Sequence, residues 1–379
     1  MATINRLDRL TSIRGFAALY VVLFHCEGTI RGLYFKAWSG IPSKGYLAVD
    51  FFFVLSGFIL AYVYAKDFDA GRFNYRRFLV LRLGRLYPVH LVTLVAAVLI
   101  ACMPNFAQDH WLSNSGASIA SNVFLMHAWG FHESLSWNFV SWSISAEWFA
   151  YLGFPLFALS SSWFVNRPFN ACVSGVAALI AMGSIFFFVT PHAEMPNPAD
   201  AVSMLRVSLE FLTGVLLYRA YVQIAVRDRA WAAPAAIALL ISLTAVLHAA
   251  WTDQRILQDT IAVICMAGLI LALALDTRLL GKALEWRPLI VMGEASYSIY
   301  MMHGLVFLAY LAAIDAGLFA HSDDFHVALR VALALIAISI ASGFAVWRWV
   351  EIPGRELVRQ WLDRPAPQPR AFPSHSGAA

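Results

Sequence analysis

Charged residues are scarce in this sequence: only 13% of its 379 residues are Asp, Glu, Lys or Arg, while 60% are hydrophobic. A soluble domain carries about twice this charged fraction, so the composition excludes an ordinary soluble domain. Apolar runs of membrane-spanning length recur from end to end, and they are continuous rather than alternating, which argues against a barrel. We therefore predict an all-α fold, a polytopic transmembrane helix bundle.

Cysteine is rarer still, with four residues, and no Cys-x-x-Cys pair or Cys/His cluster occurs. We expect neither a disulfide framework nor a metal site, and no bound cofactor. The first apolar run is preceded by arginines, as a signal peptide would be. However, Phe24 and His25, at its far end before Cys26, are too large for a signal peptidase site. We predict that this run is retained as a helix.

Ten apolar runs have roughly the 20 residues that a bilayer crossing needs. A shorter apolar piece, 117–129, is predicted to be an interfacial or re-entrant helix. Residues 1–351 form one predicted transmembrane domain without an internal repeat, and 352–379, rich in Pro and Arg, form a predicted disordered cytoplasmic tail. The predicted spans are about 13–30, 46–65, 83–103, 138–160, 171–190, 203–221, 231–250, 257–276, 288–312 and 328–350.

Basic residues are distributed unevenly between the connections. With the N-terminus inside, most of them fall on the cytoplasmic side, above all in 66–85, 278–287 and the segment after 347. The positive-inside rule then predicts that both termini are cytoplasmic. This bias accounts for the net charge of +4, so the charge indicates no nucleic-acid partner.

Arg14 and His25 stand at opposite ends of the first span. They are eleven residues apart, almost three helical turns, so both project from one face about 16 Å apart. This geometry suits a long, thin ligand with an anionic head and a reactive far end. The alternative is an arginine at the membrane surface and a histidine hydrogen-bonded between helices, and the spacing alone favours neither.

Two carboxylates lie within spans, where charge is costly and functional candidates are expected. Asp50 lies near the outer end of the second span, on the same side as His25, and could orient the imidazole or simply favour the helix start. Glu147 lies about ten residues into the fourth span, shares a face with Ser143, and has no local basic partner. His25 is its natural candidate partner.

The segment "YRRFLVLRLGRLYP" (75–88) forms a basic cytoplasmic entrance. Arg82 and Arg85 are helical neighbours, with Arg76 nearby, and two guanidiniums on one face bind phosphate well. Anionic lipid contact combined with a topology signal is the alternative. The pair Tyr87-Pro88 is interpreted as a break at the start of the third span.

The late segment "GEASYSIYMMHG" (293–304) places two polar residues on one face, Ser296 and His303, seven residues apart. Tyr297 and Tyr300 lie between them. His303 falls in the middle of the predicted span, which makes it a further candidate for chemistry.

Five motifs in order resemble the acyltransferase 3 family of integral membrane acyltransferases. "LTSIRGFAALYVVLFH" resembles its first-helix Arg-x10-His signature, and "GYLAVDFFFVLSGFIL" its second-helix motif. "RLGRLYP", "WSISAEWFAY" and "GEASYSIYMMH" resemble the Arg-x-x-Arg-x-Tyr-Pro, Trp-Ser-x-x-x-Glu and Gly-x-x-Ser-Tyr-x-x-Tyr-x-x-His elements. "WRWVEIPGREL" resembles the closing Glu-x-Pro, carried here by Glu351 and Pro353.

The resemblance implies transfer of an acyl group, usually acetyl from cytoplasmic acetyl-CoA, to a sugar hydroxyl of an extracytoplasmic or lipid-linked glycan. It implies that Arg14 and His25 are essential and that Arg82 and Arg85 help to handle the donor. It also implies a bacterial inner membrane location. Some members carry an added extracytoplasmic hydrolase-like domain, which we do not expect here.

These inferences combine into a mechanistic hypothesis. Arg14, with Arg82, Arg85 and Arg76, binds the phosphates of acyl-CoA, and the thioester reaches His25. His25 acts as general base, oriented by Asp50 or Glu147, or carries the acyl group itself. Candidate contacts to the oxyanion or the acceptor are Ser143, Tyr297 and His303.

A transporter or flippase is the competing class. Asp50, Glu147, His25 and His303 would then form a proton relay that moves an acyl or glycan substrate without chemistry. The lack of an internal repeat weakens this hypothesis, because many transporters show internal pseudo-symmetry. The acceptor glycan and the oligomeric state are not encoded in any motif that we recognise.

Overall fold

The computed structural model describes residues 7–30, 33, 40–103, 112–189, 201–225, 229–249, 255–276, 279–320 and 322–364. Within these ranges the chain is helical, and strand pairing is limited to an isolated bridge between Leu112 and Leu135. The α-helices are α1 (Asp8–Thr29), α2 (Leu47–Asp69), α3 (Tyr75–Ala101), α4 (Gly116–Val123), α5 (Trp142–Ser161), α6 (Pro168–Val189), α7 (Ala201–Ile224), α8 (Ala232–His248), α9 (Arg255–Leu275), α10 (Leu279–Leu284), α11 (Arg287–Glu294), α12 (Ser296–Asp315), α13 (Phe325–Val346) and α14 (Ile352–Leu362). Short 3-10 segments are η2 (Pro42–Lys44), η3 (Phe139–Ser141) and η4 (Ser162–Phe164), and η5 (Trp347–Glu351) is π-helical.

Seven helices of the described chain are long and apolar enough to cross a membrane. They are α1, α2, α3, α6, α9, α12 and the continuous stretch Phe325–Leu362. Helices α5, α7 and α8 occupy the other three predicted spans, but α8 is shorter, and α7 carries Arg206, Glu210 and Arg219. The all-helical prediction is confirmed, and the chain is a multi-pass membrane protein. The count of ten crossings stays a prediction.

Helix α3 starts earlier than the sequence analysis predicted. It begins at Tyr75 because the side chain of Asn74 accepts a hydrogen bond from the backbone N–H of Arg77 at 2.9 Å. Pro88 lies inside the helix and does not break it, so the predicted break is wrong. Gly354 of α14 packs directly against the Pro88 ring, and this packing supports the helix where proline removes a hydrogen bond.

The predicted span 288–312 is two helices, α11 and α12, which meet at Ala295. The predicted disorder after residue 351 is also incorrect for Ile352–Leu362, which forms α14. This helix is held because Val358 packs against Gly84 of α3 and Asp363 pairs with Arg77 at 2.7 Å. The rest of the predicted tail, 365–379, lies outside the described residues.

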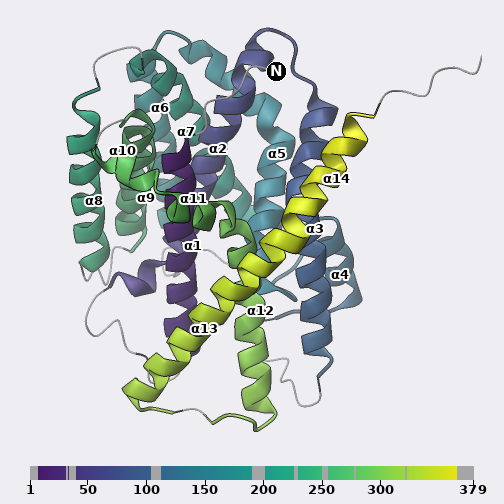
Figure 1. Ribbon diagram of the computed structural model, residues 1–379. Helices are drawn as coiled ribbons and strands as arrows, with labels where there is room; N and C mark the ends of the chain where they lie inside the picture. Colours follow the sequence, from purple (N-terminus) through teal and green to yellow (C-terminus); the bar gives the residue numbers. More distant parts are fainter. Residues whose placement is uncertain are drawn as a thin grey trace, which may run out of the picture.

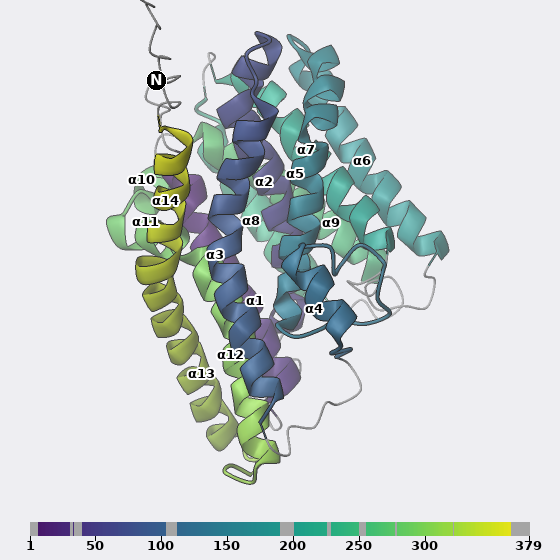
Figure 2. The ribbon, with the colours of Figure 1, turned by 90° about the vertical axis from the view of Figure 1, so that its right-hand side faces the viewer.

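Helix α2 packs closely against α7 in the interior of the bundle (Figures 1 and 2). Gly57 of α2 lies against the backbone carbonyl of Phe211, and Gly214 of α7 lies against that of Val54, so neither position has room for a Cβ atom. Small residues at such crossings let backbones approach where lipid supplies no hydrophobic drive. The α2 and α7 backbones are therefore in close contact at Gly57 and Gly214.

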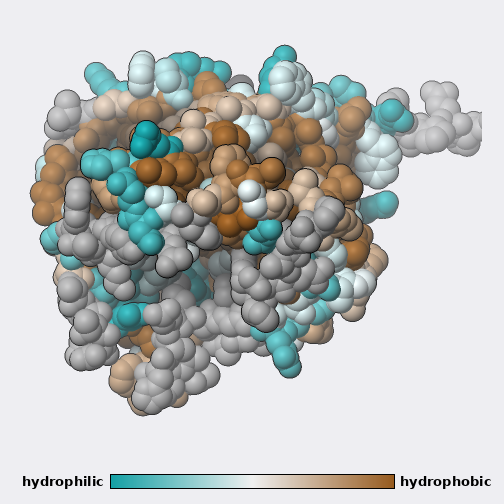
Figure 3. Space-filling view, turned by 90° about the horizontal axis from the view of Figure 1, so that it is seen from below, coloured by the Kyte–Doolittle hydropathy of each residue, from teal (hydrophilic) through white to brown (hydrophobic). Residues whose placement is uncertain are grey.

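The start of α1 and the end of α14 lie toward the same end of the bundle (Figure 1). Arg9 of α1 forms an ion pair with Glu285 at 3.5 Å. Glu285 lies between the short helices α10 and α11, so this pair holds them against α1. Figure 3 views the opposite end, where hydrophilic patches interrupt a broad hydrophobic area. This arrangement agrees with two termini on one side, although the side itself is a prediction.

Candidate active site

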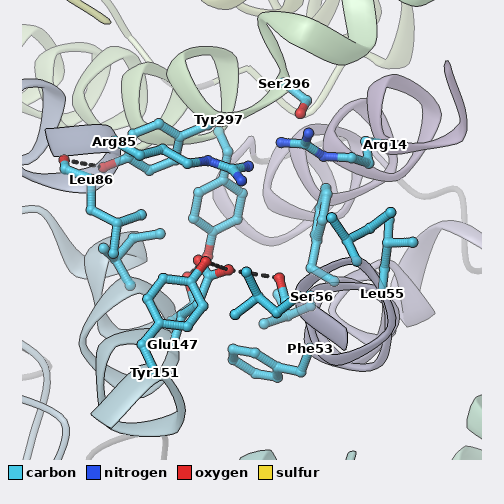
Figure 4. Close-up of a pocket in the computed structure, with 17 residues that line it drawn as sticks. Arg14, Phe53, Leu55, Ser56, Arg85, Leu86, Glu147, Tyr151, Ser296 and Tyr297 are labelled. Atoms are coloured by element: carbon cyan, nitrogen blue, oxygen red, sulfur yellow. Dashed lines mark hydrogen bonds between the residues drawn. The ribbon is translucent and has the colours of Figure 1, made fainter. Parts of the chain in front are cut away.

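A cavity lies among α1, α2, α3, α5 and α12 (Figure 4). It contains about 740 Å³ of space free of protein atoms, its opening included. A wall that combines apolar side chains with convergent polar groups is typical of a small-molecule site. The polar residues that line it are Arg14, Ser56, Arg85, Ser143, Glu147, Tyr151, Ser296, Tyr297 and Tyr300.

Two arginines point toward one another from opposite sides of the cavity (Figure 4). Arg14 comes from α1 and Arg85 from α3, and within the described chain neither guanidinium has a hydrogen-bond or ion-pair partner. Beside Arg14, the buried hydroxyl of Ser296 at the start of α12 also has no partner. Both arginine residues are half-buried, and guanidiniums form strong charge-assisted bonds to anions, so this end of the cavity suits an anionic ligand.

Glu147 lies on another wall of the cavity, where two hydroxyl groups fix its carboxylate. Its Oε1 atom accepts hydrogen bonds from Ser56 Oγ at 2.6 Å and from the Tyr151 hydroxyl at 2.5 Å. No contact joins it to His25 among the described residues, so the predicted pairing is wrong. The sequence analysis did not identify these two partners. Ser56 lies on another helix, α2, and Tyr151 lies one turn after Glu147 in α5.

His25 pairs with a second histidine rather than with a carboxylate. Its Nδ1 atom lies 2.9 Å from the Val21 carbonyl and 3.3 Å from Nε2 of His303, whose own Nδ1 bonds to the Tyr300 carbonyl. Both groups beside Nδ1 of His25 are acceptors, so this pattern assigns the proton to Nδ1. Nε2 of His25 then keeps a free lone pair, as a base or nucleophile requires.

Tyr300 connects the cavity with the histidine pair. It lines the cavity, and its ring centre is 5.3 Å from that of His303, which is 5.0 Å from that of His25. Ser143 Oγ lies 2.9 Å from the Tyr300 hydroxyl, which donates to the Val140 carbonyl at 2.9 Å. Ser143 is thus placed at the histidine side of the cavity, and its contact with the oxyanion or the acceptor stays a prediction.

Other predicted contacts lie differently. The Tyr297 hydroxyl donates to the Leu86 carbonyl at 2.6 Å, so its proton is not directed at an oxyanion, contrary to the prediction. Arg82 lies outside the cavity lining and its guanidinium packs over the Tyr64 ring, 5.7 Å from the ring centre. Arg76 is exposed near the start of α3 and does not reach the cavity.

Asp50 does not orient His25 either, because it pairs with α7. Arg206 Nε lies 2.7 Å from Asp50 Oδ1, and Nη2 contacts the same oxygen. Arg206 Nε also lies 3.3 Å from Glu210 Oε1. The sequence analysis missed Arg206 and Glu210, although two charges one turn apart inside a predicted span were a usable signal.

A further acid–base pair lies near Arg85. Glu351, on the π-helical turn η5, is buried, accepts a hydrogen bond from Ser298 at 2.7 Å and lies 3.5 Å from Arg355. π-Helical turns are often found at functional positions. The closing Glu-x-Pro element of the sequence pointed to Glu351, whereas no sequence motif pointed to Arg355.

Comparison with known proteins matches the profile of the family described as "Acyltransferase domain", Acyl_transf_3, over residues 7–348. The chain belongs to this acyltransferase family. It is 28% identical to "Acyltransferase MdmB" of Streptomyces mycarofaciens, over 93% of this chain and 92% of that protein. It is 24% identical to "Putative peptidoglycan O-acetyltransferase YrhL" of Bacillus subtilis, over 88% of this chain but 53% of that protein.

No solved structure matches this chain. The family assignment therefore rests on sequence, and it confirms the resemblance inferred from the five motifs. An acyltransferase family also favours chemistry over the transporter hypothesis. These relatives assign no roles to individual residues of this chain.

Proposed function

We propose that this protein is a membrane O-acyltransferase that moves an acyl group, acetyl in the first instance, from acyl-CoA to a sugar hydroxyl of an extracytoplasmic or lipid-linked glycan. The observation that carries this proposal is the pair of unpartnered arginines at one end of the cavity and the His25–His303 pair beyond the other. By helix rise, Arg14 and His25 are about 16 Å apart along α1.

Arg14 and Arg85 bind donor phosphate in this proposal, because guanidiniums form charge-assisted bonds to phosphate and have no competing partner. Ser296, beside Arg14, adds a neutral hydroxyl. Arg82 and Arg76 lie nearer the start of α3, where they attract the anionic donor before it enters. The apolar wall holds the pantetheine arm, which points the thioester toward Tyr300.

The chemistry requires a base for the acceptor hydroxyl. Nε2 of His25 takes the hydroxyl proton while the sugar oxygen bonds to the thioester carbon. The carbon–sulfur bond then breaks, and the proton ends on the CoA thiolate. In the two-step alternative, His25 Nε2 bonds to the acyl carbon as the carbon–sulfur bond breaks and CoA leaves as the thiolate. The sugar oxygen then bonds to the acyl carbon as the carbon–nitrogen bond breaks, and the hydroxyl proton ends on the thiolate. The Ser143 hydroxyl, which donates to the Tyr300 hydroxyl in this structure, would have to turn away from Tyr300 to support the oxyanion.

The acceptor is proposed from the names of relatives and from the likeness to the family. One relative is named for peptidoglycan O-acetylation, which supports a carbohydrate hydroxyl as the acceptor class. We place the protein in the bacterial inner membrane with both termini in the cytoplasm, where acyl-CoA is made. We therefore expect activity from a reporter that works only in the cytoplasm when it is fused after residue 364, and no activity from one that works only outside the membrane.

Mass spectrometry of surface glycans tests this function. A strain that lacks the gene is compared with the same strain carrying the wild type or His25→Gln, after growth with labelled acetate. We expect labelled acetyl esters on a glycan only with the wild type. Equal glycan acetylation in all three strains, with both proteins present in the membrane, would contradict the proposal.

A further inference from the structure

A second buried polar cluster lies at the α2–α7 interface and is separate from the cavity. It consists of Asp50 of α2 with Arg206 and Glu210 of α7, whose exposed fractions are 1%, 5% and 0%. None of the three lines the cavity. The acyl-transfer proposal assigns no role to this cluster.

The charges of this cluster do not balance. Two carboxyl groups share one guanidinium, and Arg206 reaches only one oxygen of each, Oδ1 of Asp50 and Oε1 of Glu210. The other oxygens, Oδ2 of Asp50 and Oε2 of Glu210, are buried without any hydrogen-bond partner. With both acids ionised, the cluster would carry an uncompensated negative charge in the protein interior, which is strongly unfavourable.

Within the ranges that the structure describes, neighbouring elements do not supply the missing positive charge. Asp259 of α9 is the other charged group that acts on Arg206, and it is paired with Lys44 at 2.8 Å and accepts from Tyr46 at 2.8 Å. Helix α6 carries no charged side chain. Glu147 of α5 is held by hydroxyl groups, and His25 of α1 faces His303.

We propose that this cluster is a proton-binding site, in which Asp50 and Glu210 share one proton beside Arg206 at neutral pH. Both carboxyl groups contact the same Nε atom of Arg206, so they lie side by side. A proton on one of the two unpaired oxygens turns that acceptor into a donor toward the neighbouring carboxyl group. The cluster then has no net charge. Val49, next to Asp50, and Phe53, one turn further along α2, line the cavity. The shared proton therefore holds α2 against α7 beside the active site.

The same helix pair provides a matched control. At its other end, Asp69 of α2 pairs with Arg219 of α7 through two hydrogen bonds, 2.5 and 2.8 Å long. That site has one acid for one arginine and needs no proton. Asp69→Asn therefore breaks an Asp–Arg pair without removing a shared proton, which makes it the control for substitutions of Asp50 and Glu210.

Infrared spectroscopy of the full-length protein in lipid nanodiscs tests the proposal, because a protonated carboxyl group and a carboxylate absorb at different frequencies. At neutral pH we expect a carboxylic acid band in the wild type and in Asp69→Asn. The band should be lost in both Glu210→Gln and Asp50→Asn, since removing either acid leaves a balanced pair. A band that persists in both variants, or is absent from the wild type, overturns the proposal.

A bound monovalent cation is the competing way to balance the charge. Thermal unfolding of the wild type in sodium, potassium and choline chloride separates the two. An unchanged midpoint supports the proton, whereas a sodium- or potassium-specific rise that Glu210→Gln abolishes overturns it. If one variant fails to fold, the other variant and the wild-type spectrum still decide the outcome.

Discussion

Two groups of arginines lie on different sides of α2, and they differ in burial and in their partners. Arg206 contacts two carboxyl groups and is sealed between α2 and α7. Arg14 and Arg85 line a cavity and, among the described residues, contact no acid. A paired buried arginine is satisfied by the fold, whereas an unpaired one retains its attraction for an anion that arrives from outside.

This difference assigns different consequences to the two sides of α2. Substitutions on the cavity side should change donor binding or turnover with little effect on folding. Substitutions on the α7 side should change folding first. The sequence places Asp50 and Ser56 six residues apart on one helix, yet the first belongs to the sealed cluster and the second to the cavity.

The largest effect is expected at His25. His25→Gln keeps much of the side-chain volume and a hydrogen-bonding group but cannot take a proton, and loss of a positioned base costs roughly 10²–10⁴-fold in rate. Turnover with acetyl-CoA should fall by that factor, while thermal unfolding in detergent and donor affinity stay near wild type. A purified variant that turns over at the wild-type rate would rule out the catalytic role.

The next effect concerns the sealed cluster. Arg206→Met leaves two buried acids without their cation, and breaking a buried pair costs about 3–5 kcal/mol of the free energy of unfolding. Arg14→Met should leave stability nearly unchanged, because Arg14 has no partner to lose. Denaturation of both variants in the same detergent measures the difference. Equal destabilisation by the two substitutions would remove the distinction between paired and unpaired arginines.

A smaller effect is expected for donor binding. Arg14→Met and Arg85→Met should each weaken acetyl-CoA binding by about 1.5–3 kcal/mol, the value of a charge-assisted hydrogen bond. Arg82→Met should weaken it less, since Arg82 contacts Tyr64 outside the cavity lining. Acetyl-pantetheine, which lacks the phosphates, is the control ligand, and its binding should not change. Equal losses for both ligands would exclude a phosphate role for these arginines.

The sequence predicted the helices well because continuous apolar runs are a local property. It missed the break at Ala295, where hydrophobicity continues across both helices, and the start of α3, where a cap at Asn74 decides and hydropathy does not. It also identified Arg14 and His25 as a pair on one face, because helical spacing is local. It assigned the wrong partners to Asp50 and Glu147, since contacts between helices depend on packing that spacing does not encode.

The smallest effect should come from the hydroxyl groups that hold Glu147. Ser56→Ala and Tyr151→Phe each remove one donor from the same oxygen, Oε1, and an ordinary hydrogen bond contributes about 0.5–1.5 kcal/mol. If Glu147 must keep a fixed orientation in the cavity, each variant should lower kcat/KM by up to about tenfold, and the double variant should lower it further. The stability of each variant should fall by less than that of Arg206→Met. Measuring kcat/KM with acetyl-CoA and the thermal midpoint on the same samples separates the two roles. A lower midpoint with unchanged kcat/KM in the double variant would show that Glu147 stabilises the fold and does not support turnover. Substitutions on both sides of α2 would then act mainly on stability.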